Sequence, residues 1–204
     1  MKKIALITGF CNTEEKLKIL HNNILTIKEL GLDVMVFSHL YLPEYINNII
    51  DYTIISKENP VSIWPGKYIN QWYLFRFNGA EYHMSVATPD YGYAVLNQIK
   101  RMADLALSMD YDHFFVIDYD VNINEHVKSA LLDNKKNSFF PGKKKEDIFD
   151  ISLYLISLDR QHLINFKNLI SKKSYLTNPH DCAEAWLHKA VPFIPGIIEN
   201  EPVS

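Results

Sequence analysis

The fold of this 204-residue chain is decided by one segment, Phe114-Phe115-Val116-Ile117-Asp118-Tyr119-Asp120. Four consecutive apolar residues are typical of a strand that is covered on both faces in a parallel sheet. The strand leads directly into two carboxylates separated by one residue. Ligands of open parallel sheets bind outside the carboxyl ends of the strands. We therefore expect Asp118 and Asp120 to lie at the functional edge of a sheet.

Three further apolar runs precede this strand, at Ile4–Ile7, Val34–Phe37 and Tyr52–Ile55. Leucine and isoleucine recur at helical spacing between the first two runs, from a cap at Asn12 or Thr13 to a stop at Gly31. A weaker helical segment begins at Pro43. This alternation of strands and helices predicts a mostly parallel central sheet with right-handed crossovers, flanked by helices.

Residues 61–90 interrupt the alternation. Asn78-Gly79 stands between two aromatic, nearly alternating runs, which is the strongest short-range signal for an inserted β-hairpin. A long helix is predicted over Tyr91–Met109, before the Asp-x-Asp strand. After it we expect strands at Ser138–Pro141 and Ile151–Ile156, a helix from Asp159 to Leu169, a further helix over Asp181–Lys189, and an extended proline-containing tail.

Composition excludes several classes of protein. Lys and Arg number 21 against 24 Asp and Glu, a net charge of −3, so binding of nucleic acid by bulk positive charge is not expected. Cys11 and Cys182 lie far apart and fit neither a disulfide framework nor a zinc spacing. No apolar run approaches the roughly 18 residues of a membrane span. We expect a cytoplasmic protein without a transmembrane segment.

Other polar and aromatic residues follow the remaining predicted parallel strands and should collect at the same edge: Thr8, Gly9 and Phe10; Ser38 and His39; and Lys57, Glu58 and Asn59. Their hydroxyls, backbone amides, imidazole and aromatic face suit a nucleotide base and ribose. A second Asp-x-Asp, Asp110-Tyr111-Asp112, precedes its strand and should therefore be a turn at the opposite edge.

Two carboxylates in this spacing are typical ligands of a hard divalent cation, because Mg²⁺ and Mn²⁺ prefer oxygen donors and are often shared with substrate phosphates. The alternative for Asp118 and Asp120 is a solvated turn at the end of a strand.

The chain resembles a GT-A glycosyltransferase of the small bacterial or phage, family-2-like type. The residues that carry this resemblance are Asp90-Tyr91-Gly92-Tyr93, Asn97-Gln98-Ile99-Lys100-Arg101, Phe115-Val116-Ile117-Asp118-Tyr119-Asp120 and, as a degraded Glu-Asp-Trp segment, Glu184-Ala185-Trp186-Leu187. The resemblance implies a single Rossmann-like GT-A domain over residues 1–204. Residues 1–120 would form the nucleotide-binding half, and 121–204 the acceptor-side half with a C-terminal wrap.

The resemblance also implies a hexosyltransferase that uses a nucleotide-diphosphate sugar, with a UDP-sugar favoured, and Mn²⁺ or Mg²⁺. Asp120 would bind the metal, and Asp118 would meet the ribose and the metal. Tyr119 would line the donor site, and Lys100 or Arg101 would meet the diphosphate or the sugar. The acceptor would be a glycan or another hydroxyl compound.

The general base is less well defined, because the family's aspartate is replaced here by Ala185. Glu184 is retained, and Asp181 lies three residues earlier on the same helical face, so either could be the catalytic base. His180 and His188 could complete a metal shell, or could cap a helix or lie on the surface.

The aromatic residues of the inserted segment have two possible roles. They could pack the hairpin's own core, or they could form a platform for a sugar acceptor, for which Trp64 is the best candidate. They are Trp64, Trp72, Tyr73, Phe75, Phe77 and Tyr82.

Two other functions remain open. One is a non-catalytic domain that binds nucleotide sugars or glycans, favoured by Ala185. The other is a haloacid-dehalogenase-type phosphatase, whose Asp-x-Asp-x-Thr motif reads Asp118-Tyr119-Asp120-Val121-Asn122 here.

Overall fold

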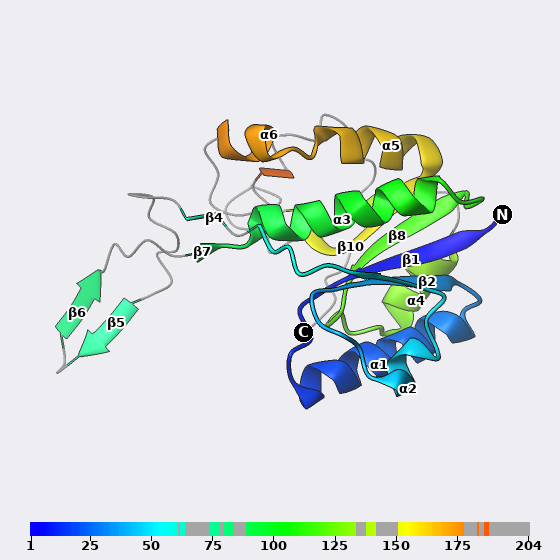
Figure 1. Cartoon of the computed structure of the whole chain (residues 1–204), viewed down its shortest axis with the longest axis horizontal. Helices are drawn as coiled ribbons and strands as arrows, with labels where there is room; N and C mark the ends of the chain where they lie inside the picture. Colours follow the sequence, from blue (N-terminus) through cyan, green and yellow to red (C-terminus); the bar gives the residue numbers. More distant parts are fainter. Residues whose placement is uncertain are drawn as a thin grey trace.

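The computed structural model describes residues 1–60, 62–63, 74–77, 80–83, 89–133, 138–141, 151–177, 183 and 186–187. Within this part of the chain, a six-stranded sheet has the strand order β3-β2-β1-β8-β10-β9 (Figure 1). The strands are β1 (Lys3–Thr8), β2 (Asp33–Ser38), β3 (Tyr52–Ile55), β8 (His113–Asp118), β9 (Ser138–Pro141) and β10 (Ile151–Asp159). The first four in the spatial order run parallel, and β10 and β9 add an antiparallel edge.

Six helices are described: α1 (Glu14–Glu29), α2 (Glu44–Asn47), α3 (Gly92–Leu107), α4 (Glu125–Leu132), α5 (Arg160–Leu169) and α6 (Lys172–Thr177). The Thr13 hydroxyl caps α1 by accepting a hydrogen bond from the Lys16 backbone N–H. The Asp159 carboxylate caps α5 in the same way, from the His162 N–H. Of the two caps predicted for α1, Thr13 is confirmed, and α5 begins directly after Asp159, as predicted.

The residues of the central strands alternate between two hydrophobic cores. Ile4 and Leu6 of β1 pack into the core under α3 and α5, and Ala5 and Ile7 pack into the core under α1, α2 and α4. Figure 1 shows these helices as two layers on opposite sides of the sheet. Burial on both faces explains why the strands are continuous apolar runs in the sequence.

The chain reverses its direction across the sheet between β3 and β8. From β1 it proceeds outward through β2 to β3, with α1 and α2 packed on one face. It then returns by way of α3, which packs on the opposite face, and enters β8 on the other side of β1. Right-handed crossovers require this change of face when the direction reverses. The topological switch point of the sheet therefore lies between β1 and β8.

The inserted hairpin is confirmed as well. Strands β5 (Leu74–Phe77) and β6 (Ala80–His83) pair antiparallel on either side of Asn78-Gly79. A short ladder of β4 (Ser62–Ile63) with β7 (Pro89–Asp90) joins the two ends of the inserted segment.

The sequence analysis missed helices α4 and α6, and it did not give the antiparallel direction of β10. In α4 only Val127 and Leu131 are fully buried, too few to show a helical period. Ala183, Trp186 and Leu187 are helical, but the rest of the predicted Asp181–Lys189 helix lies outside the described residues.

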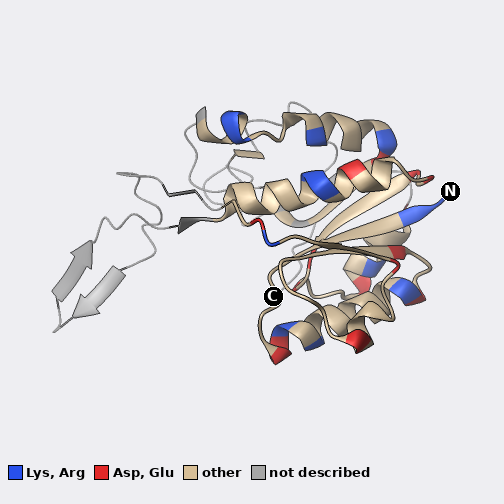
Figure 2. Ribbon diagram, viewed as in Figure 1, with Lys and Arg blue, Asp and Glu red and all other residues tan. Residues whose placement is uncertain are grey.

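No helix in the described part of the chain has the length and apolar character needed to cross a bilayer. Figure 2 shows lysine, arginine and acidic residues interspersed on the described helices.

A buried histidine gives this fold a predictable dependence on pH. His113 is 2% exposed, and its Nε2 lies 2.7 Å from the Ser157 hydroxyl. Burial, reinforced by Lys3, lowers the pKa of His113 below 6.5, although Asp159 and Asp133 oppose the shift. The unfolded chain therefore binds a proton at this residue more readily than the folded chain does.

We expect the free energy of unfolding to be highest above about pH 6.5 and to decrease as the pH falls from there through the lower pKa of folded His113. In His113→Gln this part of the pH dependence should be lost, whereas His21→Gln should retain it. Thermal unfolding between pH 5 and 8 measures the difference. An unchanged acid-side slope in His113→Gln would show that other groups cause it.

Candidate functional site

The carboxyl ends of the four parallel strands meet at one edge, as the sequence predicts. Thr8 at the end of β1 is paired with Asp118 at the end of β8, and Ser38 at the end of β2 is paired with Ile55 of β3. Asp118 thus lies beside β1 at the switch point, where open α/β sheets bind their ligands. The second Asp-x-Asp lies at the opposite edge, where Asp112 accepts a hydrogen bond from the Lys2 backbone N–H at 2.8 Å.

The loop that carries the two aspartates is held by backbone hydrogen bonds. The Tyr119 N–H donates to the Thr8 carbonyl at 2.9 Å and to Asp118 Oδ1 at 2.8 Å. The Val121 N–H donates to the Asp118 carbonyl at 3.3 Å. Asp118 is half-buried by this arrangement, whereas Asp120 is exposed.

A cleft of about 430 Å³ opens at this edge. This volume is within the range of roughly 300–1,000 Å³ that is typical of small-molecule sites. The loop after β1, the end of β2, the segment after β3, the first turns of α3 and the Asp118 loop all contribute to it. Its lining residues are Thr8, Gly9, Phe10, His39, Asn59, Tyr91, Ala94, Val95, Gln98, Asp118 and Tyr119.

A buried polar network joins three of the segments around the cleft. The His39 Nδ1 lies 2.7 Å from the Ser56 carbonyl, which only accepts, so Nδ1 carries the proton. The unprotonated Nε2 then accepts from the Gln98 side-chain amide at 2.9 Å. The Gln98 Oε1 accepts in turn from the Gly9 N–H at 3.4 Å. The network fixes the tautomer of His39 and links α3 to the ends of β1, β2 and β3.

Tyr119 packs directly on Gly9. A Cβ atom built on Gly9 would lie 2.4 Å from the Tyr119 Cδ1, so a larger residue cannot be accommodated there without displacing the ring. Burial, together with Asp120, Cys11, Asp118 and Glu15, raises the pKa of Tyr119 to about 12. The phenol is therefore protonated at neutral pH, and its O–H is available as a hydrogen-bond donor.

Cys11 lies beneath this loop and is 8% exposed. Burial raises the pKa of its thiol to about 12; Asp118 and Asp120 add to the increase, and Lys16 opposes it. A thiol that stays protonated is neither a nucleophile nor a soft metal ligand. We therefore assign Cys11 neither a catalytic nor a metal-binding role.

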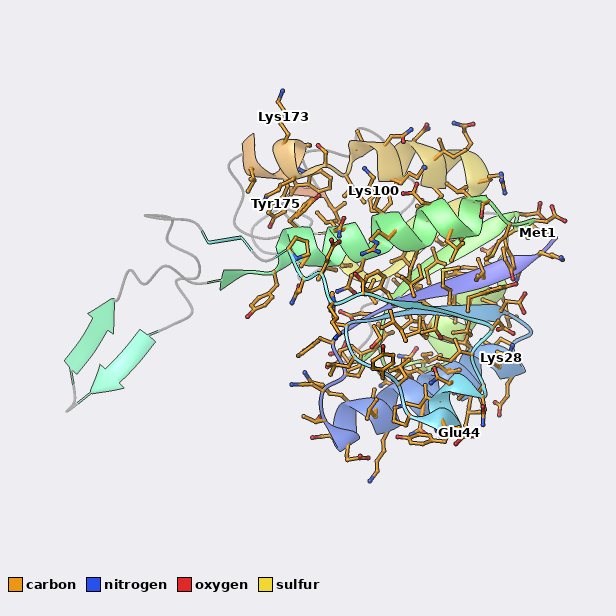
Figure 3. The ribbon with its side chains drawn as sticks, in the orientation of Figure 1. Met1, Lys28, Glu44, Lys100, Lys173 and Tyr175 are labelled. Atoms are coloured by element: carbon orange, nitrogen blue, oxygen red, sulfur yellow. The ribbon has the colours of Figure 1, made fainter. Side chains whose placement is uncertain are left out.

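The cations predicted for the site do not line the cleft. Lys100 Nζ donates to the Ile170 carbonyl at 2.8 Å, and Figure 3 shows Lys100 on the side of α3 toward α5 and α6. Arg101 donates to the Ser56 hydroxyl at 2.7 Å and lies 3.6 Å from Glu58 Oε2. Lys57 is exposed and lies outside the lining. Lys100 and Arg101 thus join elements of the fold, and their contact with diphosphate stays a prediction.

Ser38 likewise has a local role. Its hydroxyl donates to the Leu40 carbonyl at 2.6 Å and accepts from the Leu40 N–H at 3.1 Å, which closes the turn after β2. The residues expected at this edge that do line the cleft are Thr8, Gly9, Phe10, His39, Asn59, Asp118 and Tyr119.

Several expectations fall outside the described residues: the candidate bases Glu184 and Asp181, the histidines His180 and His188, and the aromatic residues Trp64, Trp72 and Tyr73. For Phe75, Phe77 and Tyr82 the structure describes the backbone alone.

Three polar side chains at the site were not predicted as site residues from the sequence. Gln98 and Tyr91 line the cleft from α3 and its N-cap, and Asn23 contacts the Asp118 loop from α1. The helical period does place Gln98 on the buried face of α3 beside Ile99 and Met102. A glutamine at a buried position was the signal that could have identified it, because buried polar side chains need a partner.

The residues present fit a hard divalent cation that is shared with a ligand. The part of the chain that the structure describes contains no group of three or more side chains that could hold a metal ion, so Asp118 and Asp120 are the described residues considered as its ligands. Mg²⁺ and Mn²⁺ are commonly held by one or two carboxylates together with substrate phosphates and water. Asp118 lines the cleft and Asp120 follows two residues later in the same loop, an arrangement suited to a metal that arrives with its substrate.

No protein-family model matches the chain, and no curated protein matches it in sequence. One solved structure similar to it is described as the crystal structure of a glycosyltransferase involved in the glycosylation of the major capsid of PBCV-1. The match covers 89% of this chain and 72% of that one, at 11% sequence identity and a TM-score of 0.47. The function of this chain therefore has to be inferred from the residues of its own cleft.

Proposed function

We propose that this protein is a metal-dependent glycosyltransferase that transfers a sugar from a UDP-sugar to a glycan or another hydroxyl acceptor. The observation that carries the proposal is the cleft at the switch point of the sheet, which places Asp118 beside groups suited to a base and ribose. Such a cleft could serve several functions. The resemblance of the Asp-x-Asp strand to that of GT-A glycosyltransferases favours glycosyl transfer among them.

The charge of the cleft supports the dependence on metal. Among its described lining residues, Asp118 is the one charged side chain, and neither lysine nor arginine is present. Lys16 lies beside the cleft, with its Nζ 3.4 Å from the Phe10 carbonyl and 5.8 Å from the centroid of the Tyr119 ring. A diphosphate would still meet no described lysine or arginine in the lining itself. Because an unpaired charge in a partly desolvated site is costly, a divalent cation between the phosphates and the aspartates is the expected solution.

Asp118 and Asp120 would hold the cation. As a Lewis acid, the bound metal would neutralise the charge that develops on the departing diphosphate. The Tyr119 hydroxyl, protonated at neutral pH, would donate a hydrogen bond to an oxygen of the donor. The exposed ring of Phe10 faces the same cleft and would stack on the base.

The acceptor hydroxyl must lose its proton to a base in an inverting transfer. Glu184 and Asp181 remain our candidates for this role, as the sequence predicts. The hydrogen bonds of the Gln98–His39 network would preserve the geometry of the cleft during transfer, because each of these buried polar groups has a partner within the network.

The binding of UDP should depend on Mn²⁺. We expect UDP with Mn²⁺ to raise the unfolding temperature by several degrees, and UDP with excess EDTA to have little effect, since a ligand stabilises only the state that binds it. Uridine, which lacks the diphosphate, should give the same small shift with and without Mn²⁺. A UDP shift that is independent of Mn²⁺ would contradict the proposed metal site.

Catalysis is distinguished from binding alone by the release of UDP from UDP-sugars in the presence of Mn²⁺. Slow release is expected even without an acceptor, because water can replace it. Metal-dependent binding without release in the presence of candidate acceptors would favour a nucleotide-sugar-binding domain, and phosphate release from simple monoesters would favour a phosphatase.

A further inference from the structure

The backbone on both sides of Asp120 is held by a single side chain of α1. Asn23 Nδ2 lies 2.8 Å from the Tyr119 carbonyl and 2.9 Å from the Val121 carbonyl. Each of the two amide hydrogens of Asn23 thus has its own acceptor, and the two acceptors are the carbonyls that flank Asp120. The contacts span 96 and 98 residues of sequence, so they join α1 to a loop that is distant from it in the chain.

The helix that carries Asn23 is firmly packed. Leu20, Ile24 and Ile27 of α1 are at most 1% exposed and lie in the core on one face of the sheet. Asn23 is next to this buried stripe and is itself half-buried. Because α1 is held in place by its buried residues, the hydrogen bonds of Asn23 hold the Tyr119 and Val121 carbonyls in a fixed position relative to the sheet.

Asp120 needs an external support of this kind. Its side chain is exposed and is not itself packed, although the next residue, Val121, is buried in the same core as Leu20 and Ile24. The opposite side of the loop is tied to β1 through the hydrogen bond from the Tyr119 N–H to the Thr8 carbonyl. Together with the burial of Val121, the hydrogen bonds to β1 on one side and to Asn23 on the other hold the backbone that presents the Asp120 carboxylate.

We infer that Asn23 is a positioning residue for the metal site: its amide holds the turn at Asp120 in the geometry that binds the cation and the diphosphate together. This inference rests on the proposed function. Groups that orient metal ligands without touching the metal typically change metal affinity by about 10- to 100-fold when they are removed.

The substitution that tests this role is Asn23→Leu, because leucine is close to asparagine in shape, favours the helix and lacks both donors. The affinity for Mn²⁺ in the presence of UDP, measured from the free Mn²⁺ signal in electron paramagnetic resonance, should fall about 10- to 100-fold. Asn22→Leu, on the exposed neighbouring position of the same helix, is the matched control and should bind Mn²⁺ as the wild type does.

A second measurement separates positioning from general damage. Uridine binding without metal should be the same in Asn23→Leu and the wild type, since Asn23 is not among the residues of the cleft lining. Parallel loss of uridine binding would overturn the inference, because it would show that the whole cleft has changed. Asn23→Ala replaces Asn23→Leu if the latter does not fold, and failure of both to fold would overturn a local role.

The two proposals fail in different ways. If the wild type binds Mn²⁺ with UDP and Asn23→Leu binds it equally well, the positioning role is wrong and the proposed function stands. If the wild type shows no Mn²⁺ binding with UDP, the proposed function fails and the inference about Asn23 fails with it.

Discussion

Substitution of Asp120 or Asp118 by asparagine should reduce the Mn²⁺-dependent release of UDP from a UDP-sugar by on the order of a hundredfold or more, because metal stabilisation of a departing diphosphate contributes several kcal/mol to the rate. Asparagine retains the size of the side chain and removes the charge that attracts the cation. Asp118 also lines the cleft, so the substitution Asp118→Asn should lower the affinity for UDP as well.

The chain contains its own control for this experiment. Asp110 and Asp112 form the same Asp-x-Asp pattern at the opposite edge of the sheet, where Asp112 binds the Lys2 backbone. We expect Asp110→Asn to release UDP at the rate of the wild type. Equal loss in Asp110→Asn and Asp120→Asn, or no loss in either, would contradict the assignment of the site to the end of β8.

Replacement of Gly9 by alanine should disrupt the cleft. The new Cβ would meet the Tyr119 ring at 2.4 Å, and the ring would have to move together with the loop that carries Asp118. We expect the free energy of unfolding to decrease by about 1–3 kcal/mol, as for other overpacked sites. Affinity for UDP in the presence of Mn²⁺ should decrease by at least about tenfold, because the displaced loop holds both aspartates and misplacement of metal ligands weakens binding.

Gly31→Ala is the contrasting variant. Nothing lies within 4 Å of a Cβ at Gly31, but its φ of +79° is unfavourable for alanine. It should lower stability by about 1 kcal/mol without changing the affinity for UDP, since Gly31 lies outside the cleft lining. Chemical denaturation and calorimetric titration measure the two quantities. Loss of UDP affinity in both variants would show that general destabilisation, and not the Tyr119 contact, is the cause.

The sequence was sufficient to predict which residues lie at the carboxyl edge of the sheet. It was not sufficient to predict the hydrogen bonds that join His39, Gln98 and Gly9 there. Buried strands are recognisable because each carries apolar residues on both faces, and their parallel direction brings Thr8 and Asp118 together. The partners of Gln98 are 59 and 89 residues away, and no local pattern encodes such pairs.

The prediction for Lys100 and Arg101 illustrates a different limit. Neighbouring residues of an α-helix point about 100° apart, so the two side chains reach different surroundings. Lys100 reaches the end of α5, and Arg101 reaches the segment after β3. The sequence showed two cations before the Asp-x-Asp strand, whereas only the packing of α3 between α5 and the sheet determines where each is directed.

The most direct test of the metal site is a crystal of the protein grown with Mn²⁺ and UDP, with data collected at a wavelength where manganese scatters anomalously. We expect an anomalous peak between the carboxylates of Asp118 and Asp120 and the diphosphate, with the uracil in the cleft near Phe10 and His39. A peak at another place in the molecule, or UDP bound in the cleft with no manganese beside these aspartates, would contradict the proposed role of the β8 edge.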